Sequence, residues 1–176
     1  MTTNMSPELE ETQGNDHPLV SREAFRDGMA HLPGAVNIIT TDGVAGQAGF
    51  TATAVCAVSD TPPTLLVCLN RNSSAAPSFT ANTALCVNTV GPEHRELAMV
   101  FGGKTPMSDR FATGHWQQGV SSAPCLQDAP LSFDCRIIAR NSVGTHDVLF
   151  CEVLDIKRRQ SPEVSVYFAR RFHDLA

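Results

Sequence analysis

The residues best suited to bind a ligand lie within residues 48–71, whose sequence is AGFTATAVCAVSDTPPTLLVCLNR. In this stretch Thr51 and Thr53 alternate with Ala52 and Ala54, so that hydroxyl groups stand along a wall of small side chains. A flat ligand can lie close to the backbone of such a strand. A strand that packs against small neighbours explains the same alternation, and these four residues alone favour that simpler explanation.

A second candidate site follows at residues 70–74, Asn-Arg-Asn-Ser-Ser. We expect a short helix over residues 73–79 with Ser74 as its N-cap, so that Pro77 falls at the third helical position, where its missing N–H costs nothing. The free N–H groups of a helix start, the hydroxyls of Ser73 and Ser74, and the Arg71 cation all suit a phosphate. Serine caps are common, and a plain cap with a solvated Arg71 is the reading that these residues alone favour. Beside the threonine–alanine wall, the segment is consistent with a flat, phosphorylated ligand.

Three further groups are candidates, and each has an ordinary structural explanation. His146 follows a Gly-Thr turn at the mouth of a strand, where a histidine more often bonds to the backbone. Phe101 and Phe111 either cover a ligand or belong to the core. Arg170 and Arg171 stand among aromatic residues, where they form either a charged edge for a second ligand or a solvated chain end.

The sequence offers no complete motif for metal, phosphate-loop or nucleophilic chemistry. The six histidines and six cysteines lack the spacings of zinc sites. Residues 103–105, Gly-Lys-Thr, resemble the end of a phosphate-binding loop, but the first glycine of that loop would be residue 98, which is alanine. A G-x-S-x-G elbow is also missing. If the protein is an enzyme, a bound cofactor therefore carries the chemistry.

Composition and charge exclude several classes of partner. The chain has 176 residues, enough for one domain, with a formal net charge of −5. An acidic protein is a poor candidate for binding nucleic acid or an anionic membrane. No apolar run reaches the roughly 18 residues of a membrane span, and the polar N-terminus lacks the order of a signal peptide. We therefore expect a cytoplasmic protein whose cysteines are mostly buried free thiols.

The elements that must position the candidate residues are mostly short strands. We expect a disordered tail over residues 1–20 and one domain over 21–176, which opens with a helix capped by Ser21 and carrying Phe25, Met29 and Leu32 on one face. A Pro-Pro turn joins the two buried strands at 49–58 and 64–69. Further strands are expected at 35–41, 84–90, 131–139, 146–156 and 164–168, with a helix after Pro92 and an irregular region over 102–130. Short strands without a βαβ rhythm predict a mainly β, antiparallel barrel with a few short helices at its rim.

The same residues carry a family resemblance. The blocks AVNIITTDG, GFTATAVCAVSDTPPTLLVCLNRNSS, LCVNT, GTHDVLF and YFARRFH occur in this order between about residues 25 and 173. They resemble the small flavin reductase components of two-component flavin-dependent monooxygenases. The stretch GGKTPM…RF…W…SFDCRI is most similar to the reductase of the pyrimidine-utilisation system, and the reductase of 4-hydroxyphenylacetate 3-monooxygenase is the next most similar.

The resemblance implies a homodimeric, FMN-binding split β-barrel that takes hydride from NADH and delivers reduced flavin to a monooxygenase. FAD is the alternative flavin, and direct hydride transfer requires no catalytic side chain. The flavin-binding residues implied are Thr51, Ala52, Thr53, Ala54, Cys68, Leu69, Asn70, Ser73 and Ser74, with Phe101 and Phe111 as covering aromatics. The NADH-binding residues implied are His146, Tyr167, Phe168, Arg170 and Arg171. A non-catalytic flavin- or haem-binding split barrel, or a barrel with no ligand, remains the alternative.

Overall fold

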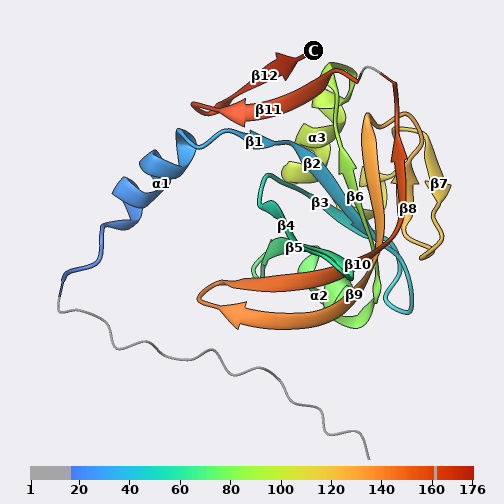
Figure 1. Cartoon of the computed structure of the whole chain (residues 1–176), viewed down its shortest axis with the longest axis horizontal. Coiled ribbons are helices and arrows are strands. Elements are labelled where there is room, and N and C mark those ends of the chain that lie inside the picture. The colour runs from blue at the N-terminus through green and yellow to red at the C-terminus, as the bar shows by residue number, and fades with distance from the viewer. Residues whose placement is uncertain (1–16, 161) are drawn as a thin grey trace, which may run out of the picture.

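The computed structural model describes residues 17–160 and 162–176 (Figure 1). Most of the predicted N-terminal tail, residues 1–16, lies outside the described residues. The fold is mainly antiparallel β with short helices, as predicted. None of the helices in the described ranges is long and apolar enough to cross a membrane.

One curled sheet of seven antiparallel strands forms the body, in the order β3-β2-β6-β9-β10-β5-β4. The strands are β2 (Asn37–Thr41), β3 (Ala48–Ala52), β4 (Val55–Asp60), β5 (Pro63–Asn70), β6 (Ala84–Thr89), β9 (Leu131–Val143) and β10 (His146–Arg158). Its main core contains Ile39, Val67, Phe79, Leu85 and Leu149.

The sheet must close on itself because of the short link between its two edge strands. β3 and β4 lie at opposite ends of the strand order, yet only Thr53 and Ala54 separate them in sequence. The three Cα-to-Cα steps of this link span at most about 11 Å. The two sheet edges are therefore held close together, and the barrel is split at Thr53 and Ala54.

Smaller elements cover the rim of this body (Figure 1). A second antiparallel sheet contains β1 (Gly34–Ala35), β11 (Val164–Phe168) and β12 (Arg171–Leu175), and a ribbon contains β7 (Trp116–Gln118) and β8 (Pro124–Leu126). The helices are α1 (Arg22–Ala30), α2 (Ala76–Ala81), α3 (Arg95–Gly102) and α4 (Met107–Arg110), with a 3₁₀ turn at Pro92–His94 before α3. Helix α1 extends from the body like an arm.

Several local predictions are confirmed. The Ser21 hydroxyl accepts a hydrogen bond from the Ala24 N–H at 3.1 Å, as an N-cap does. The strands expected at 35–41, 84–90 and 164–168 are present, and those expected at 131–139 and 146–156 are longer than predicted. The turn between β9 and β10 uses Gly144, whose φ of +56° favours glycine. All six cysteines are free thiols, and four of them are buried.

The predicted single buried strand at 49–58 is wrong. The chain forms β3 and β4 with a break between them, and β4 is exposed from Cys56 onward. The propensities of small and β-branched residues indicate strand on both sides of the break. They do not show that the chain changes partner strand at Thr53 and Ala54, which only the closure of the sheet requires.

The predicted helix at 73–79 with Ser74 as its cap is also wrong. Helix α2 begins at Ala76, and Ala75 takes the N-cap position without a side-chain hydrogen bond. The Ser73 hydroxyl instead accepts from the Ala75 N–H at 3.2 Å. This local bond holds the chain in a turn and delays the helix, and Pro77 then falls within its first two positions.

The structure contains helices and strands in two regions where the sequence predicts none. The region 102–130 contains α4 and the β7–β8 ribbon. The chain end forms β12, which pairs with β11 from Val164↔Leu175 to Phe168↔Arg171.

Candidate functional site

A hollow of about 510 Å³ opens beside the split in the barrel. It lies between β3, the last residue of β5, the first residue of β10 and the loop after α3. Drug-sized ligands occupy hollows of roughly 300–1,000 Å³, so this one has room for a mononucleotide. The predicted residues that line it are Thr51, Ala52, Thr53, Ala54, Cys68, Asn70, Ser73, Ser74, Phe101 and His146.

The threonine–alanine wall is fixed from behind by α3. The Thr51 hydroxyl donates to the Ala98 carbonyl of that helix at 2.5 Å. The Phe101 ring lies so close to Gly49 that a Cβ added there would stand 2.6 Å from the ring carbon Cε1. Thr51 and Ala52 are half-buried, whereas Thr53 and Ala54 are exposed. The wall is therefore held in place without being sealed inside the core.

Asn70 and His146 stand at the end of the sheet as directly paired residues of β5 and β10. The Asn70 side-chain oxygen accepts from the Asn72 N–H at 2.9 Å, which shapes the turn toward the serines. The Nδ1 of His146 lies 2.9 Å from the Thr145 hydroxyl. The pairing explains why two residues 76 positions apart in sequence line one hollow.

The two serines form a cradle at one end of the hollow. The Ser73 oxygen accepts from the Ala75 N–H, and the Ser74 oxygen accepts from an Arg110 Nη2 at 3.4 Å. A hydroxyl that already accepts a hydrogen bond keeps its proton for another acceptor. Both hydroxyls can therefore donate to an anion. Neither serine is the N-cap of the short helix α2, because Ala75 takes that position.

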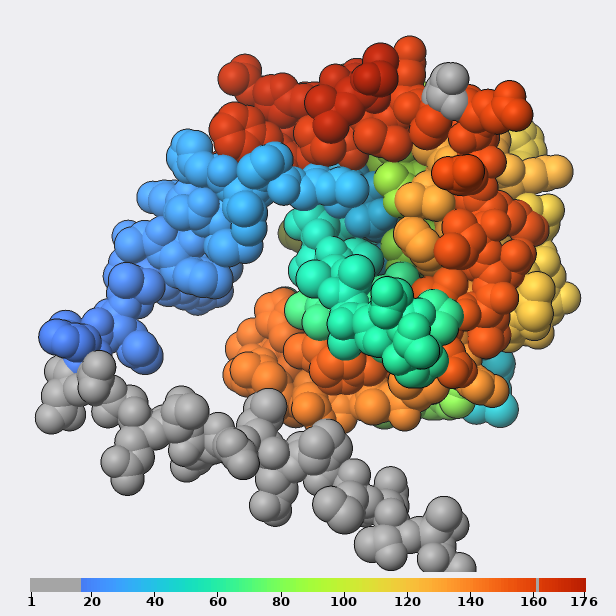
Figure 2. All heavy atoms as spheres, in the orientation of Figure 1, coloured from blue at the N-terminus to red at the C-terminus, as the bar shows by residue number. Residues whose placement is uncertain are grey.

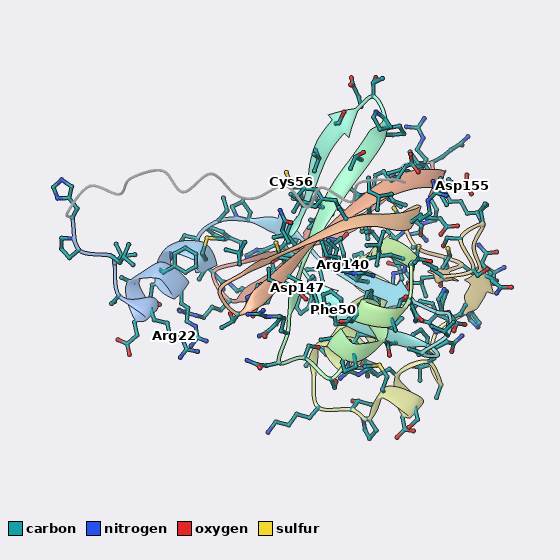
Figure 3. All side chains as sticks on the ribbon, turned by 90° about the horizontal axis from the view of Figure 1, so that it is seen from below. Arg22, Phe50, Cys56, Arg140, Asp147 and Asp155 are labelled. Atoms are coloured by element: carbon teal, nitrogen blue, oxygen red, sulfur yellow. The ribbon has the colours of Figure 1, made fainter. Side chains whose placement is uncertain are left out.

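The cation beside this cradle is Arg110 and not Arg71. The Arg71 side chain is exposed, donates to the Gly144 carbonyl and lies 3.9 Å from an Asp147 carboxylate oxygen. Arg110 is 4 % exposed and lines the hollow. Figure 3 labels Asp147, the ion-pair partner of Arg71, which belongs to β10.

Four residues of the lining were not predicted from the sequence. They are Phe50, Gly102, Gly103 and Arg110. Arg110 lies in the region expected to be irregular and has no neighbouring charge pattern to distinguish it. Two signals pointed there: a long loop in a compact domain, and the stretch GGKTPM…RF of the family resemblance, which contains Gly102, Gly103 and Arg110 without giving them a role.

Two predicted flavin-binding side chains do not line the hollow. Alternate residues of β5 face opposite sides, so Cys68 faces the hollow while Leu69, 1 % exposed, faces the core. Phe111 packs edge-on against Phe101 with ring centroids 5.0 Å apart, and also contacts Trp116. Phe111 therefore supports the ring that lines the hollow.

The predicted NADH-binding residues divide into two places. His146 lines the hollow, whereas Tyr167, Phe168, Arg170 and Arg171 belong to the β11–β12 hairpin, which forms part of the other sheet (Figure 1). Arg170 pairs with Asp27 of α1 at 2.5 Å. Within one chain, the hairpin side chains are not part of the hollow's lining.

A second recess of about 740 Å³ lies on the other side of the split. Figure 2 shows a hollowed face between α1, the segment that leads from it into β1, and the β4–β5 hairpin. Its lining is mostly apolar and includes Met29, Leu32, Val55, Leu66 and Phe133. Thr53, Ala54 and Cys68 line both hollows, so the link at the split separates them.

Charge in the first hollow is sparse and of one sign. Among the described residues that line it, none is a carboxylate. Burial raises the pKa of the Cys68 thiol and so favours its neutral form. In the described part of the chain, no group of His, Cys, Asp and Glu is arranged to hold a metal ion.

Comparisons with known proteins agree with this geometry. Residues 29–176 match the model of the flavin reductase like domain. The FMN reductase (NADH) RutF of Stutzerimonas stutzeri (strain A1501) is 60% identical over 157 residues, which cover 89% of this chain and 90% of the relative. The protein of the same name from Variovorax paradoxus (strain S110) is 54% identical over 159 residues, which cover 90% of this chain and 88% of the relative.

Solved structures give the same result. A protein from Haemophilus somnus 129PT, described as a flavin reductase, has a TM-score of 0.86 and 43% identity and covers 89% of this chain and 100% of its own. The NADH:FAD oxidoreductase SgcE6 of Streptomyces globisporus, solved with NAD and FAD fragments, has a TM-score of 0.81 and 25% identity. The match covers 91% of this chain and 98% of SgcE6. The fold is thus that of the flavin reductase split barrels, as predicted.

Proposed function

The chain belongs to the flavin reductase-like domain family, and from that premise we propose that it is an NADH-dependent FMN reductase. Its product, reduced FMN, is supplied to a partner flavin-dependent monooxygenase. The observation that carries the proposal is the open hollow, which has a flat threonine–alanine wall and ends in two serine hydroxyls that are free to donate. A planar ring on a phosphorylated chain fits both parts.

The residues present fit FMN by their chemistry. Ser73 and Ser74 would hold the phosphate, and the wall from Thr51 to Ala54 would face the ring. When bound, FMN supplies the redox chemistry, because its ring accepts hydride from NADH. The protein contributes orientation, which can be worth roughly 7–11 kcal/mol relative to a free encounter of the reactants.

Loose binding is part of this function because reduced flavin must leave. The hollow is open, and Thr53, Ala54, Asn70 and Ser74 are all exposed. A micromolar dissociation constant requires only about −8 kcal/mol. Contacts to one phosphate and partial burial of one ring can supply that.

For NADH, we propose that His146 contacts the nicotinamide nucleotide at the mouth of the hollow, where it lies opposite Asn70. Tyr167, Phe168, Arg170 and Arg171 stay a prediction for the remainder of NADH. The exposed fraction of Tyr167, 39%, leaves it accessible to a ligand in the single chain.

A role in pyrimidine catabolism is the pathway that we propose. The supporting observation is the 54–60% identity to proteins named FMN reductase (NADH) RutF over nearly the whole chain. The alternative partner, an aromatic hydroxylase of the 4-hydroxyphenylacetate type, has no comparable support. We place the protein in the cytoplasm, where free thiols such as its six cysteines are maintained.

We also propose that two copies associate through the second recess. No residue of α1 is buried, and Phe25, Met29 and Leu32 are 60%, 47% and 62% exposed. An isolated helix of 9 residues is marginal in water, so it needs a partner surface. The apolar recess beside it offers that surface to a second copy, and a two-fold arrangement would use each patch twice.

The test of the function is a steady-state assay of NADH oxidation, followed by the near-ultraviolet absorbance of NADH. We expect oxidation that requires added FMN and saturates with both substrates. Binding of FMN without oxidation of NADH would support the non-catalytic alternative. The absence of any effect of FMN, on binding or on NADH oxidation, would refute the proposal.

A further inference from the structure

Arg110 is a buried charge without a counter-charge. Arg110 is 4 % exposed, and among the described residues no carboxylate lies within ion-pair distance of it. Burial lowers its pKa, as expected for a desolvated cation. Keeping a charge without a counter-charge out of water is costly, and here only hydrogen bonds to neutral groups offset that cost.

Every N–H group of the Arg110 guanidinium already donates to an acceptor of the protein. Nη1 donates to the carbonyls of Gly49 at 2.8 Å and Phe101 at 2.9 Å, and Nε donates to that of Thr105 at 3.0 Å. Nη2 donates to the Gly103 carbonyl at 3.1 Å and to the Ser74 hydroxyl oxygen at 3.4 Å. Arg110 therefore has a fixed position and acts on a ligand through Ser74 and through its field.

The bond to Ser74 determines what that serine can do. Because Arg110 donates to the oxygen, the hydroxyl proton of Ser74 is left for an acceptor in the hollow. The Ser74 N–H also donates to no group in the described part of the chain. A serine arranged in this way favours an anion over a hydrogen-bond donor.

Among the described residues, no negatively charged side chain lines the hollow beside Arg110. The titratable residues lining the hollow are Arg110, His146 and Cys68, and burial favours the neutral thiol of Cys68. The chain as a whole has a net charge of −5, so this positive end of the hollow is a local feature.

We propose that Arg110 is the positioning residue that makes this hollow select a phosphorylated flavin over the same flavin without its phosphate. It does so by presenting Ser74 as a donor and by placing an unpaired positive charge behind the serine cradle. The proposal rests on the proposed function, since it assumes that the hollow holds a flavin. It predicts a preference for FMN over riboflavin that depends on charge at residue 110.

The experiment measures the dissociation constants of FMN and of riboflavin by quenching of flavin fluorescence, for the wild type and three variants. In Arg110→Met we expect the preference for FMN over riboflavin to fall by about tenfold, which corresponds to about 1.4 kcal/mol. Arg110→Lys keeps the charge, but the compact ammonium group of lysine cannot donate to all of the same carbonyls. We expect it to lose thermal stability and to keep the preference within about threefold.

Arg140→Met is the matched control. Arg140 also donates to backbone carbonyls, those of Phe79 and Asn82, but it contacts neither serine and does not line the hollow. We expect this variant to keep the wild-type preference. If Arg110→Met does not fold, Ser74→Ala replaces it, because Ser74 is exposed and its loss should lower the same preference.

The outcomes separate this inference from the function. Equal weakening of FMN and riboflavin in Arg110→Met would make Arg110 a structural residue only and would overturn the proposal. Loss of the preference in Arg110→Lys to the same extent would also overturn it, because charge would then not be the cause. A wild type that binds both flavins yet oxidises no NADH would refute the proposed function while leaving the binding comparison intact.

Discussion

A single methyl group at residue 49 should damage both stability and the flavin site. A Cβ at Gly49 would stand 2.6 Å and 2.8 Å from two carbons of the Phe101 ring and 3.0 Å from the Ile39 carbonyl oxygen. Phe101 is 1 % exposed and packs against the rings of Phe111 and Trp116, which limit how far its own ring can shift. The clash must therefore displace α3 or the wall of the hollow.

Overpacking of this kind costs about 1–3 kcal/mol. For a domain of this size, each kcal/mol lowers the melting temperature by roughly 2–4 °C, so Gly49→Ala should melt roughly 2–12 °C below the wild type. Because Phe101 lines the hollow, the KM for FMN should also rise. Melting is followed by circular dichroism at one fixed protein concentration, and the KM is taken from the NADH oxidation assay.

Gly28→Ala is the matched control for this substitution. A Cβ at Gly28, inside helix α1, has no atom within 4 Å. Alanine is the better helix former by about 0.5–1 kcal/mol, so this variant should melt at or above the wild-type temperature. If Gly49→Ala proved as stable as the wild type, with an unchanged KM for FMN, the packing of Phe101 on β3 would be refuted.

Three other predictions follow from the same structure. His146→Ala should raise the KM for NADH several-fold more than the KM for FMN in steady-state kinetics, and the opposite ranking would remove His146 from the nicotinamide site. Met29→Glu should convert the protein to monomers in analytical ultracentrifugation, because it places a charge in the apolar recess, whereas an unchanged mass would refute the proposed interface. At pH 8 a thiol reagent should modify Cys151 only on unfolding, because burial raises the pKa of Cys151 to about 12 and leaves roughly one thiolate in ten thousand; modification in the native protein as fast as in the unfolded protein would contradict its burial.

The parts of the site that could be predicted are those encoded by neighbouring residues. The threonine–alanine wall and the serines lie within residues 51–74 and line the hollow, and local residue types there indicate a strand followed by a turn. That the serines bind an anion stays a prediction. The turn at Gly144 and the cap at Ser21 are equally local. In each case the residue type itself favours the local structure, because glycine tolerates a positive φ and a serine hydroxyl can accept from the N–H groups of a helix start.

The parts that were missed depend on contacts distant in sequence. Arg110 reaches Ser74 across 36 positions, and nothing near Arg110 in the chain indicates that pairing. The break at Thr53 and Ala54 follows from closure of the sheet, which strand propensity does not encode. Strand β12 needs β11 as its partner, so its five residues resembled a solvated end when taken alone.

The measurement that tests the central claim most directly is an anaerobic single turnover of the purified protein with FMN and NADH. The absorbance of oxidised FMN in the visible and that of NADH in the near ultraviolet are followed together. We expect both absorbances to fall in a one-to-one ratio, and the reduced flavin then to pass through a filter that retains the protein. An unchanged flavin spectrum in the presence of excess NADH would contradict it.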